Sequence, residues 1–192
     1  MPKLSIIIPA KDEEAGLRRI LPVLREAHPD AEIIIVNDGS RDGTAAACRE
    51  HGVTVVSHPY GMGNGAAVKS GARAARGETL VFMDADGQHR PEDIPRLLDT
   101  LAQGYDMVVG ARGNGSQANL GRMYANNFYN RIASWMTGHR VADLTSGFRA
   151  VTAAKFREFL HLLPNGFSYP TTITMAFFRA GYGVTYLPIV AD

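Results

Sequence analysis

The sequence predicts an α/β fold in which helices cover both faces of a mostly parallel, doubly wound sheet. Short apolar runs alternate along the chain with longer segments of helical periodicity. The runs are continuously apolar, which is typical of parallel strands that are buried on both faces. Several runs lead directly into carboxylates and glycines, as expected where ligands bind at the carboxyl ends of strands. We therefore expect one domain over all 192 residues.

The first 110 residues show this alternation most regularly. Each apolar run is rich in Ile, Val or Leu, and the segments between the runs carry charged residues at helical spacing. Pro91 suits the first turn of a helix, where its missing N–H is not needed. The expected strands are 4–9, 32–36, 53–57, 79–83 and 106–110, and the expected helices are 13–27, 42–51, 65–76 and 91–102.

The rhythm changes after Gly110. Residues 113–119 are polar and contain glycine, which predicts a loop. An apolar stripe then predicts an amphipathic helix over 120–136. Two more helices, 153–160 and 171–180, and a strand over 184–188 complete the expected order. Because the sequence stops at Asp192 directly after a strand, we expect a shortened chain.

The composition is that of an ordinary globular domain, with 45% apolar and 20% charged residues. The single cysteine, Cys48, excludes an internal disulfide and fits a reducing compartment. No signal-peptide pattern precedes the first strand, and no apolar run reaches the ~18 residues that a membrane span needs. We expect a cytoplasmic protein that does not cross a membrane, although it can rest on one.

Charge is distributed unevenly along the chain. Residues 1–110 carry 12 Lys and Arg against 16 Asp and Glu, whereas residues 111–192 carry 8 against 3. An acidic first half suits a cation site, and a basic second half suits anionic ligands or an anionic surface.

Two carboxylates one residue apart, Asp84 and Asp86, directly follow the apolar run 79–83. Side chains at positions i and i+2 of an extended chain point the same way, so both can converge on one point, with Gln88 as a third oxygen donor. Their mutual repulsion favours a cation between them. Oxygen ligands of this kind suit Mg²⁺ or Mn²⁺. The alternative is a solvated acidic turn before a helix.

Polar residues also follow the first two expected strands. Glu13 comes just after the first, and Asp38 just after the second, so both lie at the same sheet edge. A carboxylate there can accept hydrogen bonds from a ribose hydroxyl or a base N–H. For the neighbouring Asp42, Gly43 and Thr44 we favour a structural interpretation as the start of the next helix.

The segment 61–66, G-M-G-N-G-A, is similar to the dinucleotide-binding fingerprint. It follows the third expected strand and not the first, and three residues separate it from that strand. We therefore expect its glycines to allow close packing of a helix beneath a nucleotide loop. A dinucleotide-dependent oxidoreductase remains an alternative.

Taken together, these motifs resemble those of inverting glycosyltransferases of family 2, which have a GT-A fold. The likeness is strongest to polyprenyl-phosphate and dolichol-phosphate sugar synthases, and it extends from Leu4 to about Pro188. It implies a Rossmann-like nucleotide-binding half, 1–110, fused to an acceptor-binding half, 111–192. The blocks that carry it, in family order, are P-A-K-D-E, V-N-D-G-S-R-D-G-T, G-M-G-N-G-A, M-D-A-D-G-Q-H-R-P-E, G-A-R and D-L-T-S-G-F-R-A.

The resemblance also implies roles for individual residues. Arg112 would face the donor phosphate, and Arg122 and Arg149 would meet an acceptor phosphate; with Asp86 these are the expected catalytic residues. Asp84, Asp86 and Gln88 would hold Mg²⁺ or Mn²⁺. The residues expected around the nucleotide are Pro9, Ala10, Glu13, Val36, Asp38 and Ala85, together with Asp84, Asp86 and Arg112.

The sequence departs from the family pattern at two of these places. Lys11 and Asp12 stand where the family often has Tyr and Asn, which removes support for base stacking by an aromatic there. Asn37 stands where the family often has a second Asp.

The acceptor is predicted from the supply of bases and cations. A phosphate monoester is already a dianion near pH 7 and needs only cationic positioning, whereas a sugar hydroxyl needs a general base. The second half of the chain offers several arginines but only Asp143 as a central carboxylate. We expect a GDP- or UDP-linked sugar donor, a polyprenyl-phosphate acceptor, peripheral contact with the cytoplasmic face of a membrane, and no nucleic acid. A saccharide hydroxyl acceptor and a non-catalytic nucleotide-binding module are the alternatives.

Overall fold

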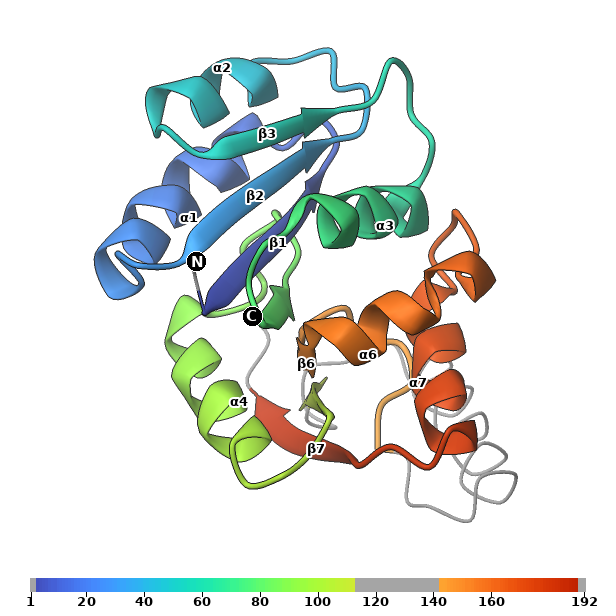
Figure 1. Cartoon of the computed structure of the whole chain (residues 1–192). Coiled ribbons are helices and arrows are strands. Elements are labelled where there is room, and N and C mark those ends of the chain that lie inside the picture. Colours follow the sequence, from blue (N-terminus) through green and yellow to red (C-terminus); the bar gives the residue numbers. More distant parts are fainter. Residues whose placement is uncertain (1–2, 113–141, 190–192) are drawn as a thin grey trace, which may run out of the picture.

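Seven strands form one sheet in the computed structural model of the chain, which describes residues 3–112 and 142–189 (Figure 1). The strand order is β3-β2-β1-β4-β6-β5-β7, and only the pairs that involve β6 are antiparallel. The expected mostly parallel α/β sheet is therefore confirmed. The strands are β1 (Leu4–Ala10), β2 (Glu32–Asn37), β3 (Thr54–Ser57), β4 (Thr79–Phe82), β5 (Met107–Arg112), β6 (Arg149–Thr152) and β7 (Val184–Ile189).

Helices cover both faces of the sheet (Figure 1). On one face lie α1 (Glu14–Ala27), α2 (Thr44–Glu50) and α4 (Ile94–Leu101). On the other lie α3 (Asn64–Ala74), α6 (Ala153–Glu158) and α7 (Tyr169–Arg179). Two 3₁₀ turns, Pro91–Asp93 and Leu160–Leu162, precede α4 and follow α6. None of the described helices is long and apolar enough to cross a membrane.

The sheet separates the two larger apolar clusters of the described residues. In β1, Ile6 and Ile8 belong to the cluster under α1, whereas Ile7 faces α3, and all three are fully buried. This is the alternation that the pleat of a strand imposes. It explains why the expected strands contain apolar residues at consecutive positions.

One strand was not predicted. Residues 149–152 form β6, which lies antiparallel between β4 and β5. Because β6 runs backwards, its first residue, Arg149, pairs with Phe82 and Val109 near the carboxyl ends of its neighbours. The loop before β6 is thereby brought to that edge. The loop expected over 113–119 and the helix expected over 120–136 lie outside the described residues.

Close packing of α3 on β1 leaves no room for a side chain at Gly71. A Cβ there would overlap the Ile7 Cγ2 methyl and lie 3.1 Å from Val36 Cγ2, and both belong to stiff β-branched side chains. We predict that Gly71→Ala destabilises the protein by about 1–3 kcal/mol despite the better helix propensity of alanine, because the core is overpacked. Urea unfolding measures this change.

Gly166→Ala is the matched control. Nothing lies within 4 Å of a Cβ at that position, so its stability should stay within about 0.5 kcal/mol of the unmodified chain. An unchanged or raised stability of Gly71→Ala would contradict the packing described above.

Candidate functional site

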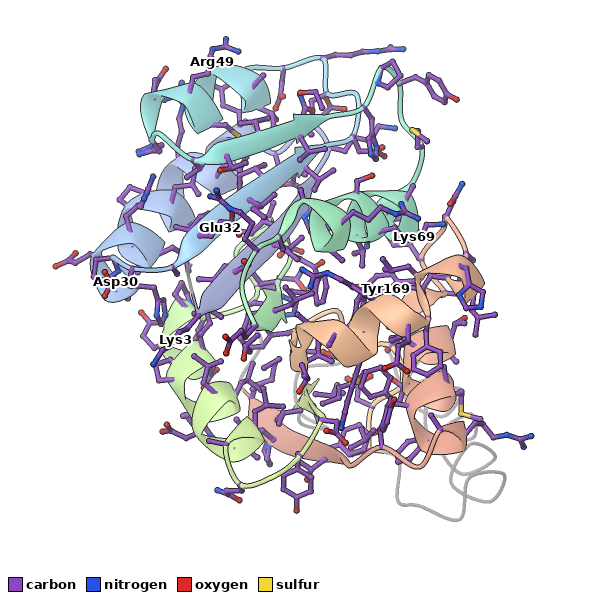
Figure 2. All side chains as sticks on the ribbon, in the orientation of Figure 1. Lys3, Asp30, Glu32, Arg49, Lys69 and Tyr169 are labelled. Atoms are coloured by element: carbon purple, nitrogen blue, oxygen red, sulfur yellow. The ribbon has the colours of Figure 1, made fainter. Side chains whose placement is uncertain are left out.

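A cleft of about 770 Å³ opens where β1, β2 and β4 end. Its opposite wall comes from the loop before β6 and from the start of α7, where Tyr169 is labelled in Figure 2. Of the residues expected around the nucleotide, the structure brings Pro9, Ala10, Glu13, Asp38, Asp84, Ala85 and Asp86 to this cleft. The wall residues are Thr145, Gly147, Phe167, Tyr169 and Pro170.

Two other expected site residues do not line the cleft. Val36 is fully buried within β2 and does not line the cleft, while Gln88 is exposed just beyond Asp86. Arg112 is the last residue of β5. Arg122 lies outside the described residues.

The turn after β4 presents the two aspartates. Asp84 is half-buried and Asp86 is exposed. The Gln88 N–H donates to Asp86 Oδ1 over 2.9 Å, and Gly87 adopts a left-handed φ of 79°, which closes the turn. The Arg19 guanidinium donates to the Asp86 carbonyl oxygen over 2.8 Å. Both carboxylates are therefore carried on a turn that is braced from α1.

His89 holds the backbone of Asp84 in place. Its Nδ1 accepts a hydrogen bond from the Asp84 backbone N–H over 3.1 Å. The imidazole is buried and stacks on Phe148, with ring centroids 4.9 Å apart. The sequence analysis assigned no role to His89. The Q-H-R-P-E block indicated that His89 belongs to the same turn as the aspartates. It did not indicate the contacts of His89 with Asp84 and Phe148.

Negative charge accumulates at this edge of the sheet. The pKa of Glu13 is raised, first because the carboxyl is partly buried and then because Asp86, Asp42, Asp84 and Asp12 lie near it. A cation would relieve this repulsion. The described residues hold no group of three or more His, Cys, Asp and Glu side chains able to bind a metal ion by themselves. Mg²⁺ in proteins is commonly held by one or two carboxylates and takes its remaining ligands from water or substrate phosphates.

Asp38 accepts three hydrogen bonds from the protein. Its Oδ1 accepts from His58 Nδ1 over 2.7 Å and from the Met62 N–H over 2.8 Å, and its Oδ2 accepts from the Gly63 N–H over 2.9 Å. His58 Nε2 in turn meets Ser70 Oγ over 2.9 Å. Burial would raise the pKa of Asp38, but these hydrogen bonds outweigh burial and lower it. Asp38 therefore anchors the loop between β3 and α3.

The glycines of segment 61–66 allow close packing. Gly63 has a left-handed φ of 102°, and a Cβ on Gly63 or Gly65 would overlap the carbonyl oxygens of Asn165 and Pro164. Lys69, which lies on α3 (Figure 2), reaches the loop that contains Asn165. It donates to Leu163 O over 2.9 Å and to Asn165 Oδ1 over 2.6 Å. Segment 61–66 and α3 are thus packed against the loop that precedes α7.

Arg149 is not presented to a ligand. Its side chain is fully buried, and its guanidinium donates to Pro170 O over 3.3 Å, to Thr174 Oγ1 over 3.2 Å and to Ser146 O. Nε has no hydrogen-bond partner among the residues that the structure describes, and burial lowers the pKa of the guanidinium. Direct contact with an acceptor phosphate, as the sequence suggested, does not fit this burial. The reason is the unpredicted strand β6, which places Arg149 inside the sheet.

Asp143 shapes the loop in front of β6. Its Oδ1 accepts hydrogen bonds from the Thr145 N–H over 2.9 Å, from Thr145 Oγ1 over 3.0 Å and from the Ser146 N–H over 3.1 Å. Gly147 then approaches the carboxylate pair, since a Cβ there would lie 3.2 Å from both oxygens of Asp84. Asp143 thereby helps to hold this loop against the site.

The model of the family "Glycosyl transferase family 2" matches residues 5–161 of this chain. The chain belongs to glycosyl transferase family 2. Two similar proteins are an undecaprenyl-phosphate 4-deoxy-4-formamido-L-arabinose transferase of Pseudomonas fluorescens (strain Pf0-1) and an undecaprenyl-phosphate mannosyltransferase of Micrococcus luteus. Each is 32% identical to this chain, and the matches cover 88% and 97% of it. They cover 55% of the first relative and 82% of the second, so the chain spans about half the length of the arabinose transferase.

The fold of this family 2 glycosyl transferase is also found among solved structures. Glucosyl-3-phosphoglycerate synthase from Mycobacterium tuberculosis, in complex with Mn²⁺, UDP and phosphoglyceric acid, superposes with a TM-score of 0.77. The match covers 97% of this chain and 68% of that one at 21% identity, so it shows a common fold. The family resemblance inferred from the motifs is therefore confirmed, and the oxidoreductase alternative is not supported.

The Asp38 network predicts a pH-dependent contribution to stability. Because the pKa of Asp38 is lowered by folding from its ordinary value of about 3.9, its stabilisation is present above that value and is lost as the pH falls through the lower folded pKa. Asp38→Asn should cost about 1–3 kcal/mol at pH 7, because an amide cannot accept both sets of hydrogen bonds. The cost should shrink below about pH 4.

Urea unfolding at pH 7 and near pH 3 measures both values. Asp99→Asn, at an exposed position of α4, is the control. An equal cost of Asp38→Asn at both pH values would contradict the network.

Proposed function

We propose that this family 2 glycosyl transferase moves a sugar, with inversion, from a GDP- or UDP-linked donor to a polyprenyl phosphate. The observation that carries the proposal is the meeting of Asp84 and Asp86 with the ends of β1 and β2 in one cleft. Both relatives described above are named as undecaprenyl-phosphate sugar transferases, which supports the acceptor class. The structural neighbour holds a nucleoside diphosphate and Mn²⁺ on the same fold, which supports the donor class.

In this proposal Asp84 and Asp86 hold Mg²⁺ or Mn²⁺, and Gln88 adds an amide oxygen. When bound, the ion supplies Lewis-acid stabilisation of the charge that develops on the departing nucleoside diphosphate. The environment of Glu13 supports this site: burial first, and then the nearby carboxylates, raise the pKa of Glu13, and a cation would relieve the part that is due to repulsion. Pro9, Ala10 and Ala85 line the cleft floor on which the nucleotide would lie.

Two arginines remain proposed ligands of phosphate. Arg112, the last residue of β5, is assigned to the donor phosphate by its place in the sequence motif. Arg122 is assigned to the acceptor phosphate by its place in the sequence motif. Arg149 acts differently in the structure, because it holds the start of α7 against the loop before β6.

A phosphate acceptor agrees with the use that the structure makes of Asp143. A hydroxyl acceptor would need a general base to remove its proton, whereas a phosphate dianion attacks without one. Asp143 Oδ1 is occupied by its own loop, and Asp143 is not among the residues that line the cleft. Because a polyprenyl phosphate lies in a bilayer, the proposal includes peripheral contact with a membrane surface.

Removing either aspartate tests the metal and the donor together. Asp84→Asn and Asp86→Asn should each lower sugar transfer by about 10²–10³-fold, the loss typical when a group that stabilises developing charge is removed. Thermal shifts with UDP, GDP and their sugars, with and without Mn²⁺, measure donor binding. Wild type should be stabilised by one nucleotide only with the ion, and the two variants should lose that dependence.

Asp99→Asn, on the exposed face of α4, should behave like wild type in both assays. Full transfer activity of Asp84→Asn, or nucleotide binding that ignores Mn²⁺, would refute the metal site.

Asp143→Asn separates the two acceptor classes. An asparagine keeps the side-chain oxygen that accepts from Thr145 and Ser146, so the loop should stay folded. With a phosphate acceptor, turnover should remain within about tenfold of wild type, because no base is lost. A fall of about 10²–10⁴-fold with donor binding intact would instead indicate a hydroxyl acceptor and a base at Asp143.

A further inference from the structure

Exposed apolar side chains are concentrated at one edge of the cleft. Among the described residues six large apolar side chains are exposed, and four of them lie on two short segments, 58–63 and 160–167. Phe167, which at 83% is the most exposed of the six, also lines the cleft. The four residues, which form an apolar rim, are Tyr60, Met62, Leu162 and Phe167.

The two segments of the rim are in direct contact. A Cβ on Gly63 would overlap the carbonyl oxygen of Asn165. The loop from β3 to α3 and the loop that precedes α7 lie on the same side of the molecule (Figure 1). Met62 stands between Gly61 and Gly63, and both glycines line the cleft together with Phe167. The rim residues therefore come from two segments that share one edge of the cleft.

The backbone under the rim is fixed although the side chains are exposed. The Met62 N–H donates to the buried Asp38, at Oδ1, over 2.8 Å. Lys69 donates to the carbonyl oxygen of Leu163, the residue after Leu162, over 2.9 Å. A backbone held in this way keeps the apolar side chains in water unless a partner covers them, and such a patch marks an interaction surface.

The charge around the rim suits an anionic partner. Neither 51–77 nor 159–191 contains an Asp or Glu. Two lysines lie beside the rim: Lys69 reaches the loop before α7, and Lys11 comes so near Gly61 that a Cβ there would lie 2.5 Å from its Nζ. Apolar and aromatic side chains flanked by lysines are typical of surfaces that bind the interface of a membrane with anionic lipids.

The position of the rim favours a bilayer over a protein partner. In the proposed function the acceptor phosphate enters the cleft from a lipid whose chain stays in the membrane. The edge of the cleft must then reach the headgroup layer, into which apolar side chains of peripheral proteins insert by about 5–10 Å. A protein docked on the rim would instead cover the edge at which that lipid enters.

We propose that this family 2 glycosyl transferase docks on an anionic lipid bilayer through the apolar rim, with Met62, Leu162 and Phe167 in the headgroup layer and Lys11 and Lys69 near lipid phosphates. The inference rests on the proposed function, since it identifies the face that meets the membrane in which the acceptor lies. The docked molecule presents its open cleft to that membrane.

Cosedimentation of the chain with lipid vesicles tests the surface. The chain should bind vesicles of about 3:1 phosphatidylcholine and phosphatidylglycerol more tightly than phosphatidylcholine alone, and added salt should weaken the binding. Met62→Ser, Leu162→Ser and Phe167→Ser should each weaken it about 3- to 30-fold, because each removes part of the apolar area that enters the headgroup layer.

Val23→Ser and Tyr105→Ser are the matched controls. Both side chains are exposed, at 40% and 38%, but Val23 lies on α1 and Tyr105 precedes β5, so neither belongs to the rim. Both variants should bind the vesicles as wild type does.

Transfer assays separate docking from chemistry. With polyprenyl phosphate in the same vesicles, Leu162→Ser should lose activity in proportion to its loss of binding. With a short, water-soluble prenyl phosphate it should match wild type, because Leu162 does not line the cleft.

Wild type that does not bind the vesicles, or rim variants that bind as tightly as Val23→Ser, would overturn the inference. A chain that instead forms a dimer through the rim, which Leu162→Ser makes monomeric, would also overturn it. In each of these cases transfer to the short acceptor would leave the proposed function standing. Vesicle binding through the rim without transfer to either acceptor would overturn the proposed function alone.

Discussion

Repulsion among carboxylates at one edge of the sheet is the constraint on which the rest of this site depends. Parallel strands end on the same side, so Glu13 after β1 and Asp84 and Asp86 after β4 are brought together by topology alone. Gly16 lets the first turn of α1 touch the Ala85 carbonyl, so the positive end of that helix lies beside the acidic turn. The helix offsets part of the repulsion, and a bound cation would offset the remainder.

The same edge uses carboxylates in two different ways. Asp38 is buried and accepts three hydrogen bonds from the protein, so it fixes the loop that carries Tyr60. Asp86 is exposed, and Asp84 lines the cleft. A buried, fully bonded carboxylate is a rigid anchor, whereas a solvated one is available to a ligand. Position in the motif does not separate these two cases, but burial and bonding do.

This distinction explains how far the sequence could predict the molecule. Buried strands such as β1 were predicted because they contain consecutive apolar residues, and the turn after β4 because two charges follow such a run directly. β6 was missed because its four residues begin with Arg149 and form no apolar run. The hydrogen bonds of Arg149 to Pro170 and Thr174 join residues that are distant in sequence, so no local sequence pattern predicts them. Strands can be predicted from neighbouring residues, whereas the partners of buried polar groups cannot.

The reversed strand β6 also decides which loop faces the carboxylates. A parallel strand at that place would start at the opposite edge of the sheet and would turn its preceding loop away from Asp84. Because β6 is antiparallel to β4, the loop 143–148 arrives at the carboxyl end of β4, where Gly147 lies against the oxygens of Asp84. Arg149 then holds that loop and the start of α7 together from inside the sheet. The buried charge is unfavourable on its own, but its hydrogen bonds join the two segments that form the second wall of the cleft.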